Sequence, residues 1–386
     1  MASLEAEFKK LSLAGKSAVE LSSLTNEKSS AKKEKGSSDT DIYYLQIHQF
    51  NGGCVDGVAD GRVAVLCSTH HVRIFNAETL VRESTIDGSD AQVTTVAFGH
   101  NSPDLVYTSS VDSEIRCWDL RLDLTKPVNV FKASENKAHA FLSFDLTYND
   151  RFMCAGTKLK KEDAMLYFWD HRQSESMGCY EDMHSDDITQ VKFHPSRQDS
   201  LLTASDDGLV NYLDISGSTE EDAIQYTFDT ASTPDKLSWI GEEEAFISTY
   251  ANTAYIWDVS SGDEKVKSDL PQFQEASKST QVEYLVDCFV DSKHSPVVLA
   301  GNSRCDGVLF NLTSPPSYIG FLPASHSQWI RACTYNIKSQ SLYTVGEDAL
   351  LCCWKPSSLI PPSPGKSRSL KAGHRVKPAV KKPYDR

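Results

Sequence analysis

The sequence has no segment typical of a membrane or secreted protein. No apolar run in its 386 residues approaches the roughly 18 residues that a membrane-spanning helix needs. Residues 1–35 are rich in Ser and Lys and contain no continuous apolar stretch that could serve as a signal peptide. We therefore expect a chain that is not secreted, has no membrane partner and resides in the cytoplasm, the nucleus or both.

The spacings that mark common enzymes and metal sites are also missing. The sequence contains no G-x-x-x-x-G-K-[ST], G-x-G-x-x-G, G-x-S-x-G or H-E-x-x-H. Its ten cysteines include no C-x-x-C pair, and most of them lie in apolar runs, where cysteine behaves as a small hydrophobic residue. These absences predict a protein that is not an enzyme and has no catalytic residue, no metal site and no cofactor.

Negative charge is concentrated in the middle of the chain. The net charge is −14 for the whole chain, +1 for residues 1–40 and +7 for residues 356–386, which leaves −22 for residues 41–355. Such a body attracts basic proteins and repels nucleic acid over most of its surface. Nucleic acid is therefore expected to bind only through the basic tail, if at all.

A short motif recurs along the acidic body. Seven apolar runs end in an aromatic residue or Leu, and the last position of each motif is usually Asp or Asn. The spacings between the seven aromatic or Leu positions are 43, 51, 44, 44, 53 and 44 residues, close to the roughly 40–45 residues of a four-stranded propeller blade. The motifs are Ile74-Phe75-Asn76, Cys117-Trp118-Asp119, Phe168-Trp169-Asp170, Tyr212-Leu213-Asp214, Ile256-Trp257-Asp258, Leu309-Phe310-Asn311 and Cys353-Trp354-Lys355.

The count predicts an all-β fold, a single seven-bladed β-propeller over residues 41–355, which we expect to be a monomer. Residues 1–40 and 356–386 hold too little apolar material to pack and are predicted to be disordered. Residues 41–47 form an extended run before the first complete repeat. We predict that this run closes the ring as the outermost strand of the last blade, hydrogen-bonded to the strand that ends at Trp354. Two longer stretches, 157–163 and 270–281, are predicted to be loops.

Two repeats resemble the WD-repeat family most closely, and the resemblance extends over essentially all of residues 41–355. It implies a platform for protein–protein interactions. It also implies, in each well-formed blade, a structural tetrad of Asp, His, Ser or Thr, and Trp joined by hydrogen bonds. The matching residues are His326, Thr344, Asp348 and Trp354 in the last repeat, and His184, Thr203 and Asp207 in the fourth, where Leu213 replaces Trp.

Two adjacent repeats end in W-D-x-R, as Trp118-Asp119-Leu120-Arg121 and Trp169-Asp170-His171-Arg172. This stretch resembles the box found in substrate receptors of cullin-4 ubiquitin ligases, which dock on the damaged-DNA-binding adaptor of the ligase. The resemblance implies that Arg121 and Arg172 bind a partner. The alternative is that each arginine caps its own loop. Docking requires both guanidinium groups to be exposed on one face and not committed to carboxylates of their own blades.

Three functions therefore remain open. The first is a general scaffold for protein–protein interactions, and the second is a substrate receptor of a cullin-4 ubiquitin ligase. The third is a binder of basic ribosomal or ribosome-assembly proteins. The resemblance to relatives linked to ribosome assembly implies this third function, and the −22 charge favours it.

Overall fold

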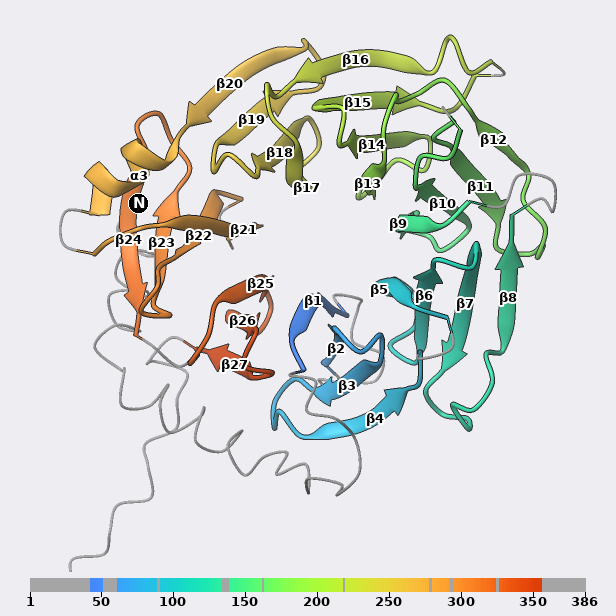
Figure 1. Ribbon diagram of the computed structural model, residues 1–386, viewed down its shortest axis with the longest axis horizontal. Helices are drawn as coiled ribbons and strands as arrows, with labels where there is room; N and C mark the ends of the chain where they lie inside the picture. The colour runs from blue at the N-terminus through green and yellow to red at the C-terminus, as the bar shows by residue number, and fades with distance from the viewer. Residues whose placement is uncertain are drawn as a thin grey trace, which may run out of the picture.

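The computed structural model describes residues 42–50, 61–88, 91–133, 139–161, 163–217, 219–277, 280–291, 294–323 and 326–355. Within these ranges the chain folds into seven antiparallel sheets arranged as a ring (Figure 1). The predicted all-β, seven-bladed propeller is confirmed. The predictions for residues 1–40 and 356–386 lie outside the described residues.

Each of the first six blades has four strands, numbered from the inside of the ring outwards, and three strands are described for the seventh. Blades one to three contain β1 (Tyr44–Gln49), β2 (Arg62–Cys67), β3 (Val72–Asn76) and β4 (Arg82–Ile86); β5 (Val93–Phe98), β6 (Leu105–Ser110), β7 (Glu114–Asp119) and β8 (Asn129–Lys132); and β9 (Phe141–Leu146), β10 (Phe152–Thr157), β11 (Leu166–Asp170) and β12 (Gly178–Tyr180). Blades four and five contain β13 (Ile188–Phe193), β14 (Ser200–Ser205), β15 (Leu209–Asp214) and β16 (Ile224–Asp229); and β17 (Pro234–Ile240), β18 (Glu244–Thr249), β19 (Ala254–Asp258) and β20 (Asp263–Ser268). Blades six and seven contain β21 (Tyr284–Val290), β22 (Pro296–Gly301), β23 (Gly307–Asn311) and β24 (Ser317–Leu322); and β25 (Ile330–Asn336), β26 (Ser341–Gly346) and β27 (Leu351–Trp354).

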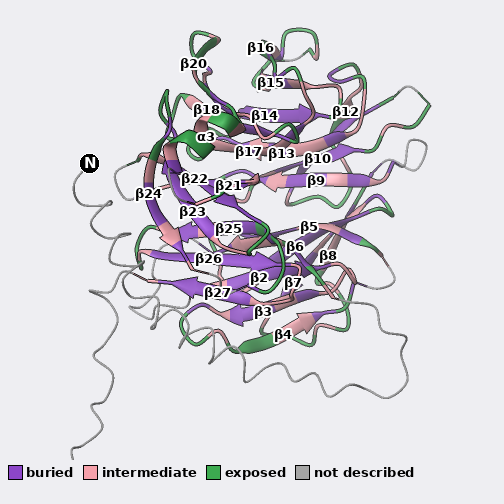
Figure 2. Ribbon diagram, turned by 60° about the vertical axis from the view of Figure 1, so that its left-hand side comes forward, coloured by how far each residue is buried: buried purple, intermediate pink, exposed green. Residues whose placement is uncertain are grey.

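The seven motifs found in the sequence all fall on the third strands of the blades. These strands are β3, β7, β11, β15, β19, β23 and β27. The second strands are more deeply buried: all six residues of β14 are buried, whereas the outer strand β16 is largely exposed. Figure 2 shows the same gradient, with buried strands inside the ring and exposed segments at its periphery.

Hydrophobic side chains join each blade to the next. The buried residues form seven clusters, and each cluster combines residues of two neighbouring blades. The faces of neighbouring sheets therefore cover each other's apolar side chains. Burial of these seams is the main stabilising contribution, because each strand face removes apolar area from water.

The prediction that residues 41–47 form the outermost strand of the last blade is wrong. The segment pairs with the first blade and not with the last: in β1, Tyr44 lies opposite Cys67 of β2 and Gln49 lies opposite Val63. The ring closes at this point through one more hydrophobic seam, in which β1 and β2 pack against β25 and β26. The Tyr343 hydroxyl crosses the seam and donates a 2.9 Å hydrogen bond to the Ala77 carbonyl. The physical reason is that strands close in sequence pair most easily, and β1 can form a hairpin-like pair with β2.

The predicted loop at 270–281 contains a short helix, α3 (Leu270–Ser277). Asp269 precedes the helix and exchanges two hydrogen bonds with Gln272, an arrangement known as a capping box. Phe273 is fully buried, with its ring 5.2 Å from that of Phe310. The cap and the buried aromatic residue explain why this stretch is helical, and it covers the outer side of the sixth blade.

Candidate functional site

The two faces of the ring differ in their turns. We call the face that carries the turns after the first and third strands the lower face. The upper face carries the turns after the second strands and the connections between blades. The two W-D-x-R arginines follow the third strands of adjacent blades, so both lie on the lower face.

The Asp or Asn of the repeated motif caps the turn that follows its strand. In five blades its side-chain oxygen accepts the backbone N–H two residues later, at 2.9–3.0 Å. This arrangement is an Asx turn, which fixes the chain direction at the strand end. The residue that donates this N–H is Glu78, Arg121, Arg172, Ser216 or Ser260. An arginine at this position is therefore compatible with the same turn that serine forms elsewhere.

Both W-D-x-R arginines are bound to carboxylates of their own blades. The Arg121 guanidinium donates to both oxygens of Asp119, from Nε at 2.9 Å and from Nη2 at 2.7 Å. Arg172 forms the same fork with Asp170. The side chains are nonetheless 65% and 68% exposed. Hydrogen bonds from Arg121 lower the pKa of Asp119 to about 2, and those from Arg172 lower the pKa of Asp170. Two of the three conditions for docking are met, because both guanidinium groups are exposed and lie on one face. The third is not met, because both are bound to carboxylates of their own blades.

We expect the double substitution Arg121→Ala and Arg172→Ala to shift the melting temperature by less than about 2 °C. Such exposed ion pairs contribute little because water and salt screen them, and the Asx turn keeps its backbone hydrogen bond in the variant. Thermal unfolding followed by circular dichroism measures the shift. A loss of more than about 5 °C would contradict this assignment and indicate that the forks hold the blades together.

The tetrad residues of the last blade form one chain of hydrogen bonds. His326 Nδ1 lies 3.0 Å from an Asp348 oxygen, and His326 Nε2 lies 2.9 Å from the Thr344 hydroxyl. The Trp354 indole N–H donates to the same hydroxyl at 3.0 Å. Asp348 also accepts the backbone N–H groups of Ser327 and Leu350. Burial opposes ionisation of Asp348, but its hydrogen bonds outweigh burial and lower the pKa of this carboxyl group.

In the fourth blade, the chain of hydrogen bonds lacks its tryptophan. His184 bridges Asp207, at 3.1 Å, and Thr203, at 2.9 Å. Leu213 stands at the tryptophan position, as the sequence predicts, and is fully buried. The Asn211 side-chain amide adds a contact by donating to the Met183 carbonyl at 2.8 Å.

The other blades keep only parts of the tetrad. In the second blade Trp118 donates to Thr108 at 2.9 Å, and Arg116 binds Asp112 in the absence of a histidine. In the fifth blade the indole nitrogen of Trp257 is buried without a partner. The strand register places Ile247 where the second, fourth and seventh blades have threonine, which removes the acceptor. The substitution of a single residue thus removes a hydrogen bond from the tetrad of a given blade. Because parts of the tetrad recur in several blades, we assign it a structural role.

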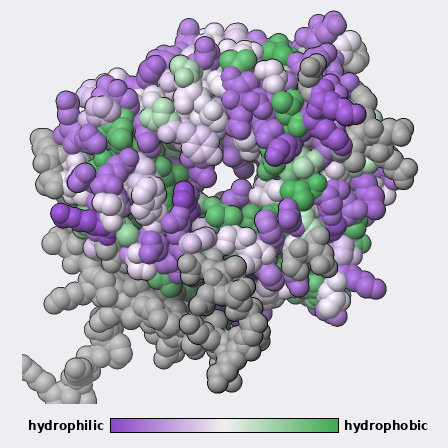
Figure 3. All heavy atoms as spheres, viewed as in Figure 1, coloured by the Kyte–Doolittle hydropathy of each residue, from purple (hydrophilic) through white to green (hydrophobic). Residues whose placement is uncertain are grey.

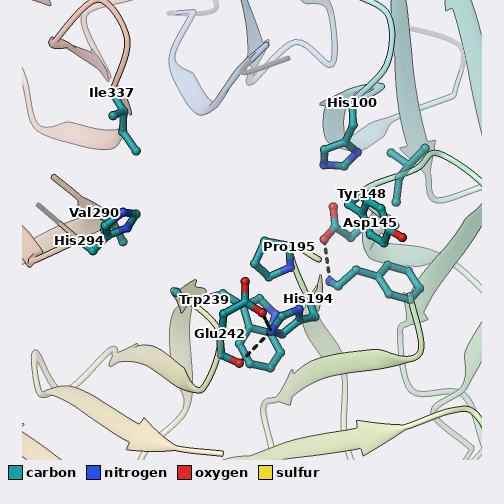
Figure 4. Close-up of a pocket in the computed structure, with 13 residues that line it drawn as sticks. His100, Asp145, Tyr148, His194, Pro195, Trp239, Glu242, Val290, His294 and Ile337 are labelled. Carbon is teal, nitrogen blue, oxygen red and sulfur yellow. Dashed lines mark hydrogen bonds and ion pairs between the residues drawn. The ribbon is translucent and has the colours of Figure 1, made fainter. Parts of the chain in front are cut away.

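The lower end of the central channel opens into a cavity of about 440 Å³ (Figure 4). Turns after the first strands of six blades line it, and they contribute His100, Tyr148, Pro195, Glu242, His294 and Ile337. His194 is held below this surface: its Nε2 lies 2.9 Å from the Glu242 carbonyl, and its Nδ1 accepts backbone N–H groups. Burial lowers the pKa of His194, which favours the neutral ring. These contacts indicate a structural role for His194.

The upper end opens into a second cavity of about 590 Å³, lined by large aromatic and apolar side chains. Trp329 stacks on Tyr284 with ring centres 4.9 Å apart and an interplanar angle of 10°. The apolar part of the lining also includes Tyr43, Leu45, Tyr250, Leu285, Val286 and Ile330. These residues come from the first, fifth, sixth and seventh blades, so the sequence gives no local signal for the cavity, and our sequence analysis missed it. Figure 3 shows the opening of the channel at the centre of the ring, with hydrophobic residues at its edge.

Acidic side chains gather on the upper face beside this cavity. We call Asp186, Asp187, Asp206 and Asp235 the acidic set. Asp186 and Asp187 directly precede β13, and Asp206 lies in the turn between β14 and β15. Asp235 lines the cavity. Partial burial and the charges of Asp187, Asp186 and Asp207 raise the pKa of Asp206. The carboxylates therefore repel one another, and a cation placed among them would be stabilised.

Within the described part of the chain, no three His, Cys, Asp or Glu side chains come together as a metal site would require. The same residues include no helix long and apolar enough to cross a membrane.

The ring, the capped third strands and the tetrads are those of a WD-repeat β-propeller, and the chain is similar to proteins of the WD-repeat family. The family model described as "WD domain, G-beta repeat" matches residues 81–119, which extend from the outer strand of the first blade through the third strand of the second. The repeat in the sequence is thus offset by one strand from the blade in the structure.

Similar proteins carry WD-repeat names. The chain is 27% identical to WD repeat-containing protein GTS1 of Arabidopsis thaliana, over 76% of this chain and 78% of that protein. It is 22% identical to the WD repeat-containing protein 89 homolog of Dictyostelium discoideum, over 77% and 80% of the two chains. A chain in the crystal structure of the mitotic checkpoint complex superposes with a TM-score of 0.61 at 14% identity, covering 83% of this chain and 93% of that one. This last likeness shows the fold alone.

Proposed function

We propose that the chain is a non-enzymatic platform that binds basic proteins. The observation that carries the proposal is the charge of the ring, −22 over residues 41–355, together with the acidic set on its upper face. Charge of one sign over a rigid surface attracts partners of the opposite sign and raises their association rate. Basic ribosomal or ribosome-assembly proteins are partners of this chemistry.

Affinity purification of the full chain from a cell lysate, followed by mass spectrometry, tests this function. We expect the retained proteins to be enriched in strongly basic chains, and most of them to be lost when the salt concentration rises from about 0.1 to 0.5 M, because salt screens exposed charges. Retention of mainly neutral or acidic proteins, or retention that does not depend on salt, would overturn the proposal.

A substrate receptor of a cullin-4 ubiquitin ligase is the second candidate. Exposure of Arg121 and Arg172 on one face supports it, and their commitment to Asp119 and Asp170 weighs against it. The same purification separates the two functions, because a receptor should retain the damaged-DNA-binding adaptor and the Arg121→Ala, Arg172→Ala variant should lose it.

A further inference from the structure

We infer that the upper cavity binds an extended basic segment of a partner protein, with an apolar side chain against Trp329 and a Lys or Arg side chain beside the acidic set. This inference rests on the proposed function and adds the place of binding and the chemistry of recognition. Its basis is that an exposed aromatic surface and Asp235 of the acidic set line the same cavity.

The apolar half of the site is unusually exposed. The exposed fractions are 37% for Tyr43, 40% for Leu45, 68% for Tyr250 and 44% for Trp329, and all four residues line this one cavity. Large apolar side chains gathered around a hollow commonly mark a binding surface. Tyr284 supports Trp329 from below and is itself fixed, because its hydroxyl accepts the Ile330 N–H at 3.0 Å. The aromatic platform is therefore preorganised, which reduces the entropy lost on binding.

Two cations at the cavity do not make it basic. Arg331 forms an ion pair with Glu347 and lies over the Trp329 ring, with its guanidinium carbon 5.9 Å from the ring centre. Burial raises the pKa of the nearby Asp287 carboxyl group, and the positive charge of Lys236 opposes this rise. Each positive charge thus has a carboxyl group nearby, whereas Asp206 is affected by the charges of three further carboxylates.

Tyr250 lines the cavity together with Asp235. Burial raises the pKa of its hydroxyl group, and the charges of Asp235, Lys236, Asp206 and Arg331 also act on it, so all four residues lie nearby. A segment that crosses this side chain would therefore place one residue on the aromatic platform and a nearby residue among the carboxylates. A basic side chain fits the second position, because an acidic one would be repelled. The same repulsion excludes the phosphates of nucleic acid.

The experiment measures binding of a dye-labelled synthetic peptide of alternating arginine and leucine residues to the full chain by fluorescence anisotropy. We expect Trp329→Ala, and separately the pair Asp186→Asn and Asp206→Asn, to weaken binding about tenfold each. Tyr148→Ala and Glu242→Gln on the lower face are the matched controls and should leave the affinity unchanged. Two peptide controls, with arginine replaced by glutamate or leucine by serine, should bind at least tenfold more weakly.

Several results would overturn the inference. If the lower-face variants weaken binding and the upper-face variants do not, the site is wrong while the proposed function survives. If the peptide fails to bind the wild-type chain at all, the proposed function falls as well. The basic residues of 356–386 could occupy the cavity themselves. In that case, replacing their lysines and arginines by glutamate in the full chain would raise the peptide affinity, and an internal segment would take the place of the inferred partner. Circular dichroism confirms that each variant is folded.

Discussion

Replacing Asp348 with alanine is expected to lower the free energy of unfolding by roughly 3–5 kcal/mol, because it leaves the partners of a buried carboxylate without their acceptor. The Asp348 side chain is 4% exposed and that of His326 is fully buried. In the variant, His326 and the backbone N–H groups of Ser327 and Leu350 would lose their hydrogen bonds to the Asp348 carboxylate. Urea denaturation followed by tryptophan fluorescence measures the change.

Asp112→Ala is the matched control. Asp112 lies at the corresponding turn of the second blade, but its side chain is 37% exposed and Arg116 is its charged partner. We expect a cost below about 1 kcal/mol for this exposed pair. Equal costs for Asp112→Ala and Asp348→Ala would contradict the assignment of the tetrad as a buried network.

The effect of Asp348→Ala should also depend on pH. The pKa of Asp348 is lowered, so its contribution is present above its ordinary value near 4 and is lost as the pH falls through the folded value. Burial disfavours the charged form of His326, but Cys352 and Asp348 outweigh burial and raise its pKa. The contribution of His326 is therefore complete below about pH 6.5 and declines as the pH rises through the raised value. The difference between the wild type and the variant should be largest between about pH 4 and pH 6.5.

Removal of β1 is expected to abolish cooperative folding of the ring. A chain that begins at Phe50 would lose the inner strand of the first blade, including the buried Tyr44, and would uncover the seam with the last blade. A chain that begins at Ile42 keeps β1 and is the matched control, for which we expect a single cooperative transition. Differential scanning calorimetry distinguishes the two. A chain from Phe50 that still unfolds in one sharp transition would show that β1 is dispensable for closure.

The sequence was most informative where similar residues, an aromatic residue or Leu, recur at one position of every blade. The third strands and the chain from His326 to Trp354 could be located from spacing, because a buried His and Asp need partners at fixed offsets. The spacing could not show which strand of a blade comes first in the sequence. Residues 41–47 form an extended run that suits either an inner or an outer strand, and only its pairing with β2 decides between them.

Two further features depend on contacts that the linear pattern does not record. Arg121 and Arg172 each donate hydrogen bonds to the Asp two residues earlier in the chain. The W-D-x-R pattern cannot predict these bonds, because it is the same for an arginine that caps its own loop and for one that docks a partner. The upper cavity brings together Tyr43, Tyr250 and Trp329, which are separated by up to 286 residues in the sequence. Helix α3 is different, because Asp269 and Gln272 were a readable signal that the sequence analysis passed over.

The seam between the first and last blades is built like the other six, from interlocking apolar side chains of two sheets. In the described part of the chain, the packing of this seam is therefore of the same kind as that of the others. The same fold should accept a circularly permuted chain that opens at another connection between blades, such as residues 230–233 between β16 and β17, with the native ends joined by a flexible linker. Gene fusions and internal labels could then be attached at any of several points around the upper face of the ring.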